Sequence, residues 1–354
     1  MAYQFADGFD NYGNNYTLTA GYPWSTVSAT PNTVITTDSR FAAPGTLPGG
    51  CMSCAASNQN YVRQNLSSSQ PTLMAGFGFK SLTLPGTYND IFGLWDTGTL
   101  QMCLTLNSAG QLQFYRGIGT AIGTATPSNT IVANTWYGIQ VQVTINSSTG
   151  SVACYLNGSA TPILNISGLN TQTTGNASAN QVSIGSEGGG SAQPAFHYDD
   201  FFCFDTTGTT LNTLPSGDAR ILTKMPASAG NYSNWTPTGL TNNWQNAAVQ
   251  PPSTADYNAN NSAGTKDSYT SQVAGLAVAP YFVIARASLE RDDAGPHTPG
   301  IFVRSSGVDG AGVTTPALTS SYAFYDAVFP TDPATGVAWT GPGADDAQPG
   351  IIEG

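Results

Sequence analysis

Apolar and polar residues alternate along most of this chain with a period of two, the spacing of a β-strand that buries one face. In the segment 137–145 the odd-numbered positions are apolar and most even-numbered positions are polar. Residues 100–106 and 112–114 alternate in the same way around the turn from Asn107 to Gly110, which predicts a β-hairpin. Helical periodicity is nearly absent. The pattern therefore predicts an all-β chain built of antiparallel sheets.

The composition changes after the first 210 residues. Residues 211–262 are rich in Gly, Asn and Pro and contain Trp235 and Trp244, which predicts a long ordered connection. Strand alternation then returns. We expect one β-sandwich over residues 1–210 and a second, smaller β-sandwich over residues 263–354. The two tryptophans are expected to pack between these domains or to form an assembly contact with a neighbouring subunit.

Several short motifs follow one another in the first 210 residues. They are the pair Trp136-Tyr137, the pair Thr149-Gly150, and the segments VACYLNG, VSIGS and FHYDDFFCFD. In this order they resemble the second half of the concanavalin A-like, laminin-G-type jelly roll. The resemblance implies that the closing strand, FHYDDFFCFD, pairs near the N-terminal strand within AYQFADGFDNY.

The latter half of the chain resembles virion proteins of tailed bacteriophages. Three segments carry this resemblance: GDARILTKMPASAGNYSNWTPTG, YFVIARASLERDDAG and SSYAFYDAVFPTDPATGVAWT. It implies a structural component of the phage particle, displayed on the tail, baseplate or capsid surface as a decoration or adhesion module. The implied partners are other virion proteins and further copies of this chain in a homo-oligomer. The alternative is a carbohydrate-binding lectin module that attaches to host-surface glycans.

Charge and hydropathy argue against nucleic acid and membranes as partners of this chain. Charged residues make up only 9% of the chain, and ten basic residues stand against twenty-one acidic ones, for a net charge of -11. The basic residues are scattered singly, so nucleic acid is not an expected partner. No apolar run reaches the ~20 residues of a membrane span, and the N-terminal residues lack a signal-peptide pattern. We expect a protein made in the host cytoplasm that resides in the virion, without membrane insertion.

The closing strand contains an acidic pair flanked by a histidine and aromatic residues. Strand alternation places Asp199 and Asp200 on opposite faces, with His197 on the face of Asp199, so the two carboxylates are expected to have structural roles. Retaining glycoside hydrolysis needs two carboxylates ~5–5.5 Å apart.

The three glutamates offer no such pair by sequence spacing: they are Glu187, Glu290 and Glu353. Neither His197 nor His297 lies near a nucleophile elbow. We therefore predict no catalytic residue and a chain that is not an enzyme.

Two kinds of ligand site remain candidates. Laminin-G-like domains often hold calcium at a sandwich rim, and no other cofactor is expected; the alternative for these aspartates is a solvated or capping role. The candidate calcium ligands are Asp7, Asp10, Asp199 and Asp205. Lectin sites combine exposed aromatic rings with amide and carboxylate side chains, although such rings can equally fill a core or a subunit contact. The candidate glycan-binding aromatics are Tyr12, Tyr16, Tyr22, Trp24 and Tyr88.

The cysteines are expected to be free thiols, because their number is odd. They are Cys51, Cys54, Cys103, Cys154 and Cys203. The CMSC segment has the spacing of half a zinc site, but no second pair completes it and it follows a loop-like Gly-Gly. The other three lie inside apolar alternations, where a free cysteine acts as a small hydrophobic residue.

Overall fold

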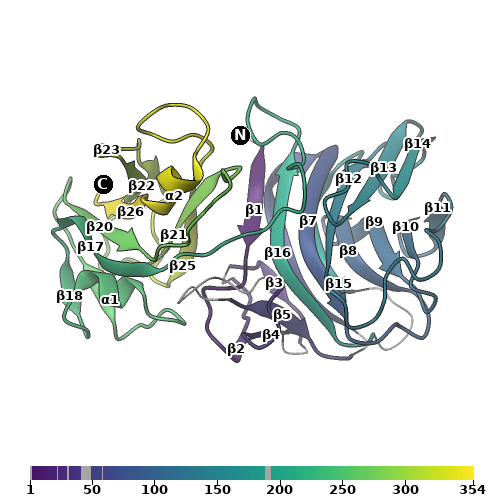
Figure 1. The fold of residues 1–354 in the computed structure, drawn as a ribbon, viewed down its shortest axis with the longest axis horizontal. Coiled ribbons are helices and arrows are strands. Elements are labelled where there is room, and N and C mark those ends of the chain that lie inside the picture. The colour runs from purple at the N-terminus through teal and green to yellow at the C-terminus, as the bar shows by residue number, and fades with distance from the viewer. Residues whose placement is uncertain (1, 22, 30–31, 41–48, 58, 188–192) are drawn as a thin grey trace. The chain divides into compact units, whose positions relative to one another are not determined.

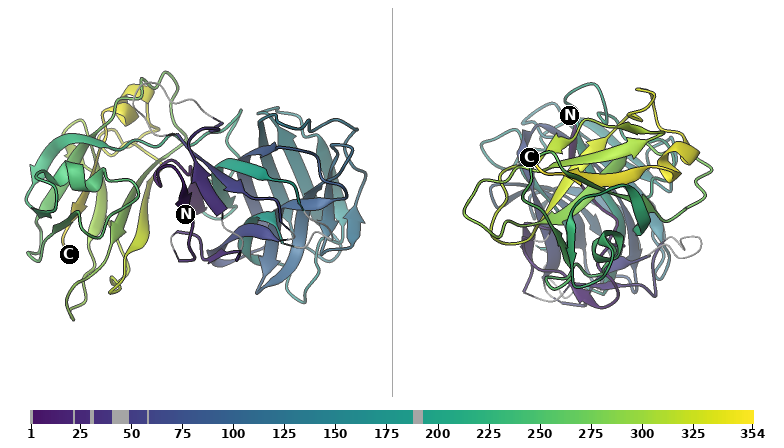
Figure 2. Two further views of the ribbon diagram at one scale, coloured as in Figure 1. Left: turned by 90° about the horizontal axis from the view of Figure 1, so that it is seen from below. Right: turned by 90° about the vertical axis from the view of Figure 1, so that its left-hand side faces the viewer.

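The computed structural model describes residues 2–21, 23–29, 32–40, 49–57, 59–187 and 193–354. The chain forms two compact units (Figures 1 and 2). Among the described residues, the first unit takes 2–9, 14–40 and 50–221, and the second takes 10–13, 49 and 222–354.

The described part of the first unit is a sandwich of two antiparallel sheets, which can be followed in Figure 1. Sheet I has nine strands, of which eight run in the order β14 (Leu164–Leu169), β13 (Gly150–Leu156), β12 (Tyr137–Thr144), β7 (Thr72–Ser81), β16 (Phe196–Asp205), β5 (Cys51–Cys54), β4 (Asn32–Ile35) and β2 (Tyr16–Thr17). The ninth, β1 (Tyr3–Asp7), pairs with β16. Sheet II has seven strands in the order β11 (Thr120–Ile122), β10 (Leu112–Arg116), β9 (Thr99–Leu106), β8 (Asn89–Asp96), β15 (Ala179–Ser186), β6 (Asn60–Gln70) and β3 (Thr26–Val27).

Three local predictions are confirmed by the strand pairing. The hairpin β9–β10 turns at Asn107, whose side-chain Oδ1 accepts hydrogen bonds from the backbone N–H groups of Ala109 and Gln111. The strands β12 and β13 pair in antiparallel fashion along their whole shared length. The closing strand β16 pairs with β1 near the N-terminus. The first unit is thus the predicted jelly-roll sandwich.

Aromatic rings fill the space between the two sheets. Phe77 of β7 stacks on Phe92 of β8 with ring centroids 5.8 Å apart, and both side chains are buried. Tyr198 of β16 crosses the same layer and donates its hydroxyl proton to the Ile91 carbonyl oxygen at 3.1 Å. Because these contacts join β7 and β16 to β8, they hold sheet I onto sheet II.

A β-bulge divides the closing strand β16 into two halves. Asp199 pairs with Gly78 of β7, and Phe202 pairs with Gly76. Two residues of β16 therefore lie between these pairs, opposite a single residue of β7. The extra residue reverses the alternation of faces beyond it. Phe202 therefore shares the outer face with Asp199 and lies over Gly76, where a Cβ atom would collide with its ring.

The second unit contains the predicted second β-sandwich. Its largest sheet in the described residues, sheet III, has six strands: β17 (Pro226–Ser233), β20 (Lys266–Ser271), β26 (Gln348–Ile352), β22 (Gly300–Ser305) and β23 (Val308–Asp309) in order, with β24 (Val313–Thr314) also paired to β22. Two further strand pairs are β18 (Thr236–Thr238) with β19 (Tyr257–Ala259), and β21 (Val283–Leu289) with β25 (Ala323–Phe329). The short helices are α1 (Asn243–Ala247) and α2 (Gly341–Asp345).

The core of the second unit joins strands β21 and β25 to sheet III. Ala285 and Ala327 contribute from the strand pair, and Ile301 contributes from β22. Trp339 is fully buried in this cluster and donates its indole N–H to the Phe329 carbonyl oxygen at 2.8 Å. The apolar side chains and the satisfied indole together make a compact core of its own for this unit.

The predicted connection over residues 211–262 is corrected by this topology. The first unit extends to Ile221, and the second unit begins at Leu222. Strand β17 lies inside the predicted connection and pairs with β20 of sheet III. The Gly- and Asn-rich composition hid this strand, because β17 is largely solvent-exposed and lacks the apolar alternation of a buried strand.

The prediction of free thiols is confirmed for all five cysteines, and each of them is buried. Cys51 and Cys54 lie in strand β5, which begins directly after the Gly-Gly pair. Burial raises the pKa of Cys154 to about 12, which keeps this thiol protonated at neutral pH. Among the described residues, no helix has the length and apolar character needed to cross a membrane.

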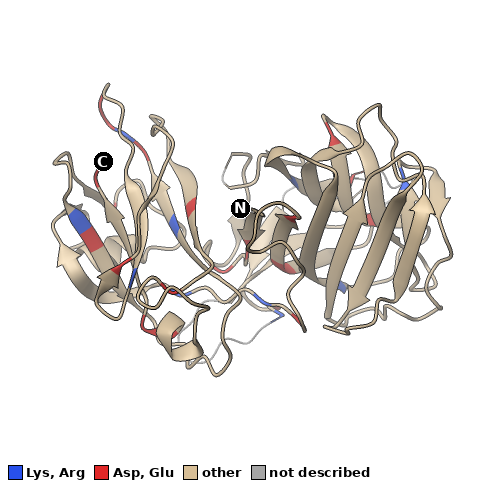
Figure 3. Cartoon of the chain, turned by 90° about the horizontal axis from the view of Figure 1, so that it is seen from above, with Lys and Arg blue, Asp and Glu red and all other residues tan. Residues whose placement is uncertain are grey.

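Charged residues are sparse along the chain (Figure 3). Within the described residues, eight of the ten basic side chains form ion pairs with carboxylates. One cluster in the second unit contains a histidine: His297 Nδ1 lies 2.7 Å from Glu353 Oε1, and Nε2 lies 3.0 Å from Asp293 Oδ1. These contacts with Glu353 and Asp293 raise the pKa of His297 above its ordinary value.

We predict that His297 makes the stability of the chain depend on pH. Because the pKa is raised in the folded state, the stabilisation is fully present below the unfolded value of about 6.5 and is lost as pH rises through the folded value. The wild-type chain should exceed His297→Gln in urea midpoint at pH 6 and lose this advantage by about pH 9. An equal difference between the two proteins at both pH values would contradict the prediction.

Candidate functional site

The acidic pair of the closing strand does not lie as the sequence predicts. Both Asp199 and Asp200 contact Arg40, because Asp200 is the bulged residue, with a φ of 54°. Arg40 donates its backbone N–H to Asp199 Oδ2 at 2.9 Å and its Nη1–H to Asp200 Oδ2 at 3.0 Å. The expectation of opposite faces is therefore wrong, since it assumes an unbroken two-residue alternation.

The Arg40 side chain lies flat on the outer face of sheet I. Gly78 and Gly138 leave room for it, since a Cβ atom at either position would collide with the arginine. Its guanidinium also pairs with Asp218, and Asp200 Oδ1 accepts the Ile221 N–H at 2.8 Å. Burial raises the pKa of Asp200, and the Arg40 charge opposes this rise. These contacts make the acidic pair an anchor for the segments that cross the sheet.

His197 belongs to a second cluster on the same face. Its Nδ1 lies 2.6 Å from Asp38 Oδ2, and Lys80 Nζ donates to both oxygens of Asp38 at 2.8 and 2.9 Å. Trp136 Nε1 donates to the same carboxylate at 3.3 Å. Burial lowers the pKa of His197, and Asp38 acts against this change. The arrangement joins four distant segments through one carboxylate.

The predicted calcium ligands of the first unit accept hydrogen bonds from protein groups. Asp7 accepts the Trp24 indole N–H at 2.9 Å and the Phe9 N–H at 3.1 Å. Asp205 accepts Gln4 Nε2–H at 2.5 Å, and Asp199 accepts hydrogen bonds from Arg40 and Asp200. Asp10 belongs to the second unit, whereas the other three belong to the first. Within the described ranges, no group of three His, Cys, Asp or Glu side chains is placed to hold a metal ion; calcium binding stays a prediction.

The predicted glycan-binding aromatics divide by burial. Trp24 and Tyr12 are fully buried, so they cannot offer a ring face to a sugar and that assignment is corrected. Tyr16 is half-buried on β2, and Tyr22 lies outside the described residues. Tyr88 alone of the described candidates is exposed, with 37% of its surface accessible. It precedes β8 and stacks on Tyr115 of β10 with ring centroids 5.2 Å apart.

Tyr115 begins a row of residues across the outer face of sheet II. The cross-strand partners along this row are Tyr115, Cys103, Gly93, Ser183 and Arg63. Phe92 packs on sheet I, so its neighbour Gly93 points to the opposite, outer side. Cys103, Gly93 and Ser183 are small, so the surface is lower at the centre of the row than at Tyr115 and Arg63, and we call this central part the floor.

Trp95 lies on this floor. A Cβ atom on Gly93 would approach Trp95 Nε1 to 2.7 Å, and that nitrogen donates to Ser183 Oγ at 2.8 Å. The Arg63 guanidinium stands 4.0 Å from the indole ring centroid, a cation–π contact. Tyr115 packs against the small cluster of Trp95, Leu100 and Cys103. The indole is thus covered from both ends of the row.

One carboxylate pairs with Arg63, and a second lies near that partner. Glu187 pairs with the Arg63 guanidinium, and the Glu187 backbone N–H donates to Asp90 Oδ2 at 3.0 Å. Burial raises the pKa of Glu187, Arg63 opposes the rise, and the Asp90 charge adds to it. Sequence spacing gives Glu187 no carboxylate partner, and the carboxylate that acts on it in the fold, Asp90, comes from the separate strand β8.

Sequence reasoning does not find most residues of this outer surface of sheet II. Arg63, Trp95 and Gln181 are not among the predicted site residues, and the structure places them on β6, β8 and β15 of sheet II. A signal was present at Gln113 and Tyr115, which alternate with the buried Leu112 and Phe114. Only the strand order of sheet II brings these positions onto one surface.

Both predicted tryptophans of the connection lie in the second unit. Trp235 is half-buried; its backbone N–H donates to Asp267 Oδ1 at 3.3 Å and its indole N–H to the Thr265 carbonyl oxygen at 3.5 Å. Trp244 is half-buried on α1. Their role in assembly or interdomain packing stays a prediction.

Comparison with known proteins gives similarity at the level of fold. No known family and no curated protein matches the chain. Similar solved structures include the catalytic domain of a glycoside hydrolase family 131 protein from Coprinopsis cinerea, with 12% identity, 62% of this chain and 98% of that one covered, and a TM-score of 0.39. Trypanosoma rangeli sialidase shares 15% identity over 53% of this chain and 29% of its own, with a TM-score of 0.33. A SAP-like pentraxin from Limulus polyphemus shares 18% identity over 43% and 74%, with a TM-score of 0.30.

The prediction that the chain is not an enzyme is corrected by these neighbours. They include a sialidase and a glycoside hydrolase catalytic domain, at low identity and partial coverage. The chain spans less than a third of the sialidase.

We predict that Arg40→Ala strongly destabilises the chain. The Arg40 side chain is 3% exposed, and its loss leaves the Asp200 carboxylate buried without its cation, which costs about 3–5 kcal/mol. Arg220→Ala is the control, because Arg220 pairs with Asp218 at a 38% exposed position, where ion pairs contribute about 0–1 kcal/mol. Urea unfolding of both variants gives the comparison. Similar losses for the two variants would show that Arg40 is not an anchor.

Proposed function

We propose that the first unit is a carbohydrate-binding jelly-roll domain that uses the outer face of sheet II. The observation that carries the proposal is the exposed Tyr88 ring, held in place by stacking on Tyr115. The Tyr88 hydroxyl also donates to the Ile118 carbonyl oxygen at 3.3 Å, which fixes the ring orientation. A fixed aromatic ring offers a flat apolar surface to the C–H face of a sugar at little cost in side-chain entropy.

Amide side chains supply hydrogen-bonding groups on the same surface. Gln113 lies on β10 beside Tyr115, with its Nε2–H donated to the Gly123 carbonyl oxygen at 3.0 Å. Gln181 of β15 donates its Nε2–H to Asn65 Oδ1 at 2.8 Å and accepts from Gly98 N–H at 3.1 Å. These amides are half-buried or exposed and are oriented by their protein partners. Oriented polar groups around an aromatic platform are the usual composition of a sugar site.

The charges of this face favour a neutral glycan. Glu187 pairs with the single guanidinium of Arg63, and the charge of Asp90 acts on Glu187 from close by. The chain as a whole carries a net charge of -11. A negatively charged sugar would meet repulsion from both sources. We therefore propose uncharged hexose polymers or oligosaccharides as the ligand class.

We also retain the virion role as a proposal, with glycan binding serving attachment to the host surface. It rests on the resemblance of the latter half of the chain to phage virion proteins, and its partners would be other virion proteins and further copies of this chain.

We predict that Tyr88→Ala weakens glycan binding about 3- to 10-fold, the loss expected when a stacked aromatic contact of about 0.5–1.5 kcal/mol is removed. Binding of the purified chain to a glycan array identifies the ligand, and titration with that glycan gives the affinity. Tyr257→Ala is the matched control, since Tyr257 is equally exposed at 37% but lies in the second unit. A wild-type chain that binds no glycan, or equal losses in the two variants, would overturn the proposal.

We predict that antibody raised against this chain decorates intact phage particles. Gold-labelled antibody observed by electron microscopy gives the measurement, and its position on capsid or tail gives the location. The control is the same antibody adsorbed with purified chain. Label confined to unassembled protein, with particles unlabelled, would contradict the virion role.

A further inference from the structure

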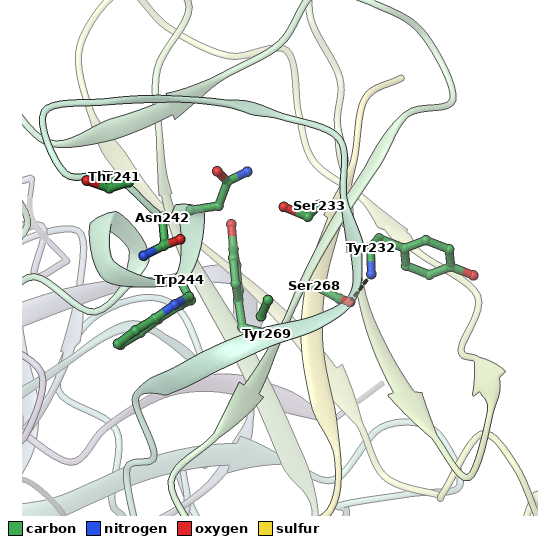
Figure 4. A pocket seen from close by; sticks show the side chains of 9 residues that line it. Tyr232, Ser233, Thr241, Asn242, Trp244, Ser268 and Tyr269 are labelled. Atoms are coloured by element: carbon green, nitrogen blue, oxygen red, sulfur yellow. Dashed lines mark hydrogen bonds between the residues drawn. The ribbon is translucent and has the colours of Figure 1, made fainter.

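A small pocket lies in the second unit between α1 and the edge of sheet III (Figure 4). Its volume is about 120 Å³. Three segments line it: β17, β20, and α1 with the residues just before it. The lining residues are Ala229, Tyr232, Ser233, Thr241, Asn242, Asn243, Trp244, Ser268 and Tyr269.

The pocket exists because β17 bulges away from β20. Ala229 pairs with Tyr269 and Ser233 pairs with Asp267, so four residue steps on β17 oppose two steps on β20. Within the bulge the Tyr232 N–H donates to Ser268 Oγ at 3.0 Å instead of to a ladder carbonyl. The extra residues separate the strand from its neighbour and leave space beside α1.

A buried carboxylate holds two walls of the pocket in place. Asp267 is fully buried, and its Oδ2 accepts the Tyr269 hydroxyl proton at 3.0 Å and Asn243 Nδ2–H at 2.6 Å. The Tyr269 hydroxyl in turn accepts Asn258 Nδ2–H at 3.1 Å. With their polar ends fixed in this way, the ring of Tyr269 and the side chain of Asn243 form rigid walls.

Other polar groups of the lining are free to bind a ligand. Among the described residues, no hydrogen bond is formed by the hydroxyls of Ser233 and Thr241 or by the indole N–H of Trp244. Trp244 is half-buried, so part of its ring remains accessible. Figure 4 shows the Tyr232 ring pointing away from Ser233, Asn242 and Trp244, which leaves Trp244 and Tyr269 as the aromatic surfaces of the pocket.

We propose that this pocket binds a single neutral sugar ring, such as the terminal hexose of a glycan. The volume is well below the roughly 300 Å³ at which pockets for drug-sized ligands begin, so one ring or less fits inside. All nine lining side chains are uncharged, so an ionic ligand would find no counter-charge in the wall. Aromatic surfaces with free hydroxyl and indole N–H groups match the C–H face and hydroxyls of a hexose. The site lies in the second unit and is independent of the surface proposed on sheet II.

The test uses the full chain carrying Tyr88→Ala, so that binding at sheet II does not contribute. Saturation-transfer NMR is recorded with the methyl pyranosides of glucose, galactose and mannose. We expect saturation of the ring protons of at least one sugar. We expect Trp244→Ala to weaken its binding about tenfold, as for the loss of one aromatic contact. Thr241→Val removes one free hydroxyl at an exposed position and should also weaken binding, without disturbing the core.

Thr236→Val is the matched control, because Thr236 is equally exposed on β18 and lies outside the pocket. Melting curves of all variants establish that they are folded. Absence of saturation with all three sugars overturns the proposal. So does binding that survives both pocket substitutions, or that falls equally in the Thr236 control. A negative result for this pocket does not test the proposed glycan site on sheet II. That site is tested separately by the glycan array and by Tyr88→Ala.

Discussion

Burial of both faces of β16 is the constraint on which the first unit depends. All ten residues of this strand are buried, although only one face meets the core between the sheets. The other face is covered by chain segments around residues 36–40 and 217–221. A strand with His, Asp and Asp on its covered face can be buried only if each charge has a partner, because unpaired buried charges are very costly. Arg40 and Asp38 meet this requirement at two neighbouring places.

Small residues make the covering segments and the outer surface of sheet II possible. Gly78 and Gly138 admit the Arg40 side chain against sheet I, and Gly93 admits the Trp95 ring against sheet II. In both sheets the planar group, a guanidinium or an indole, occupies the space that a side chain at the glycine position would fill. On sheet I the planar group closes the surface, and on sheet II it gives a base for Tyr115. A planar side chain lying over glycine thus occurs both on the covered outer face of sheet I and on the open outer face of sheet II.

The sequence predicts local structure well where a two-residue alternation runs unbroken. The hairpins β9–β10 and β12–β13 and the pairing of β1 with β16 follow from alternation, turn residues and motif order. Prediction fails where a bulge inserts one residue into a strand, as in β16, because the residues beyond it then face the opposite side. The amino-acid sequence of β16 does not show where such a bulge lies. It also fails for β17, whose exposed polar residues look like a linker.

The candidate site shows a different limit. Tyr88 and Trp24 are both candidates because they lie in loops rich in polar side chains, but Tyr88 is exposed and Trp24 is buried. The neighbours Asp90 and Glu187 come from separate strands, and Arg63 reaches Glu187 from a third. Such groupings depend on strand order and register, which arise from packing of the whole sandwich.

The scarcity and pairing of basic side chains have a consequence for the lifetime of the folded chain. Trypsin cleaves after Lys and Arg, and this chain has only ten of them; in the part of the chain that the structure describes, eight form ion pairs with carboxylates. A protease needs an extended, accessible segment of several residues around the scissile bond. Arg63, Lys80, Arg286 and Arg304 lie within paired strands, so cutting there requires local unfolding first. At these four positions the native fold therefore protects the chain from trypsin, whereas Arg220 and Arg291 lie outside the strands and are the expected first sites of cleavage.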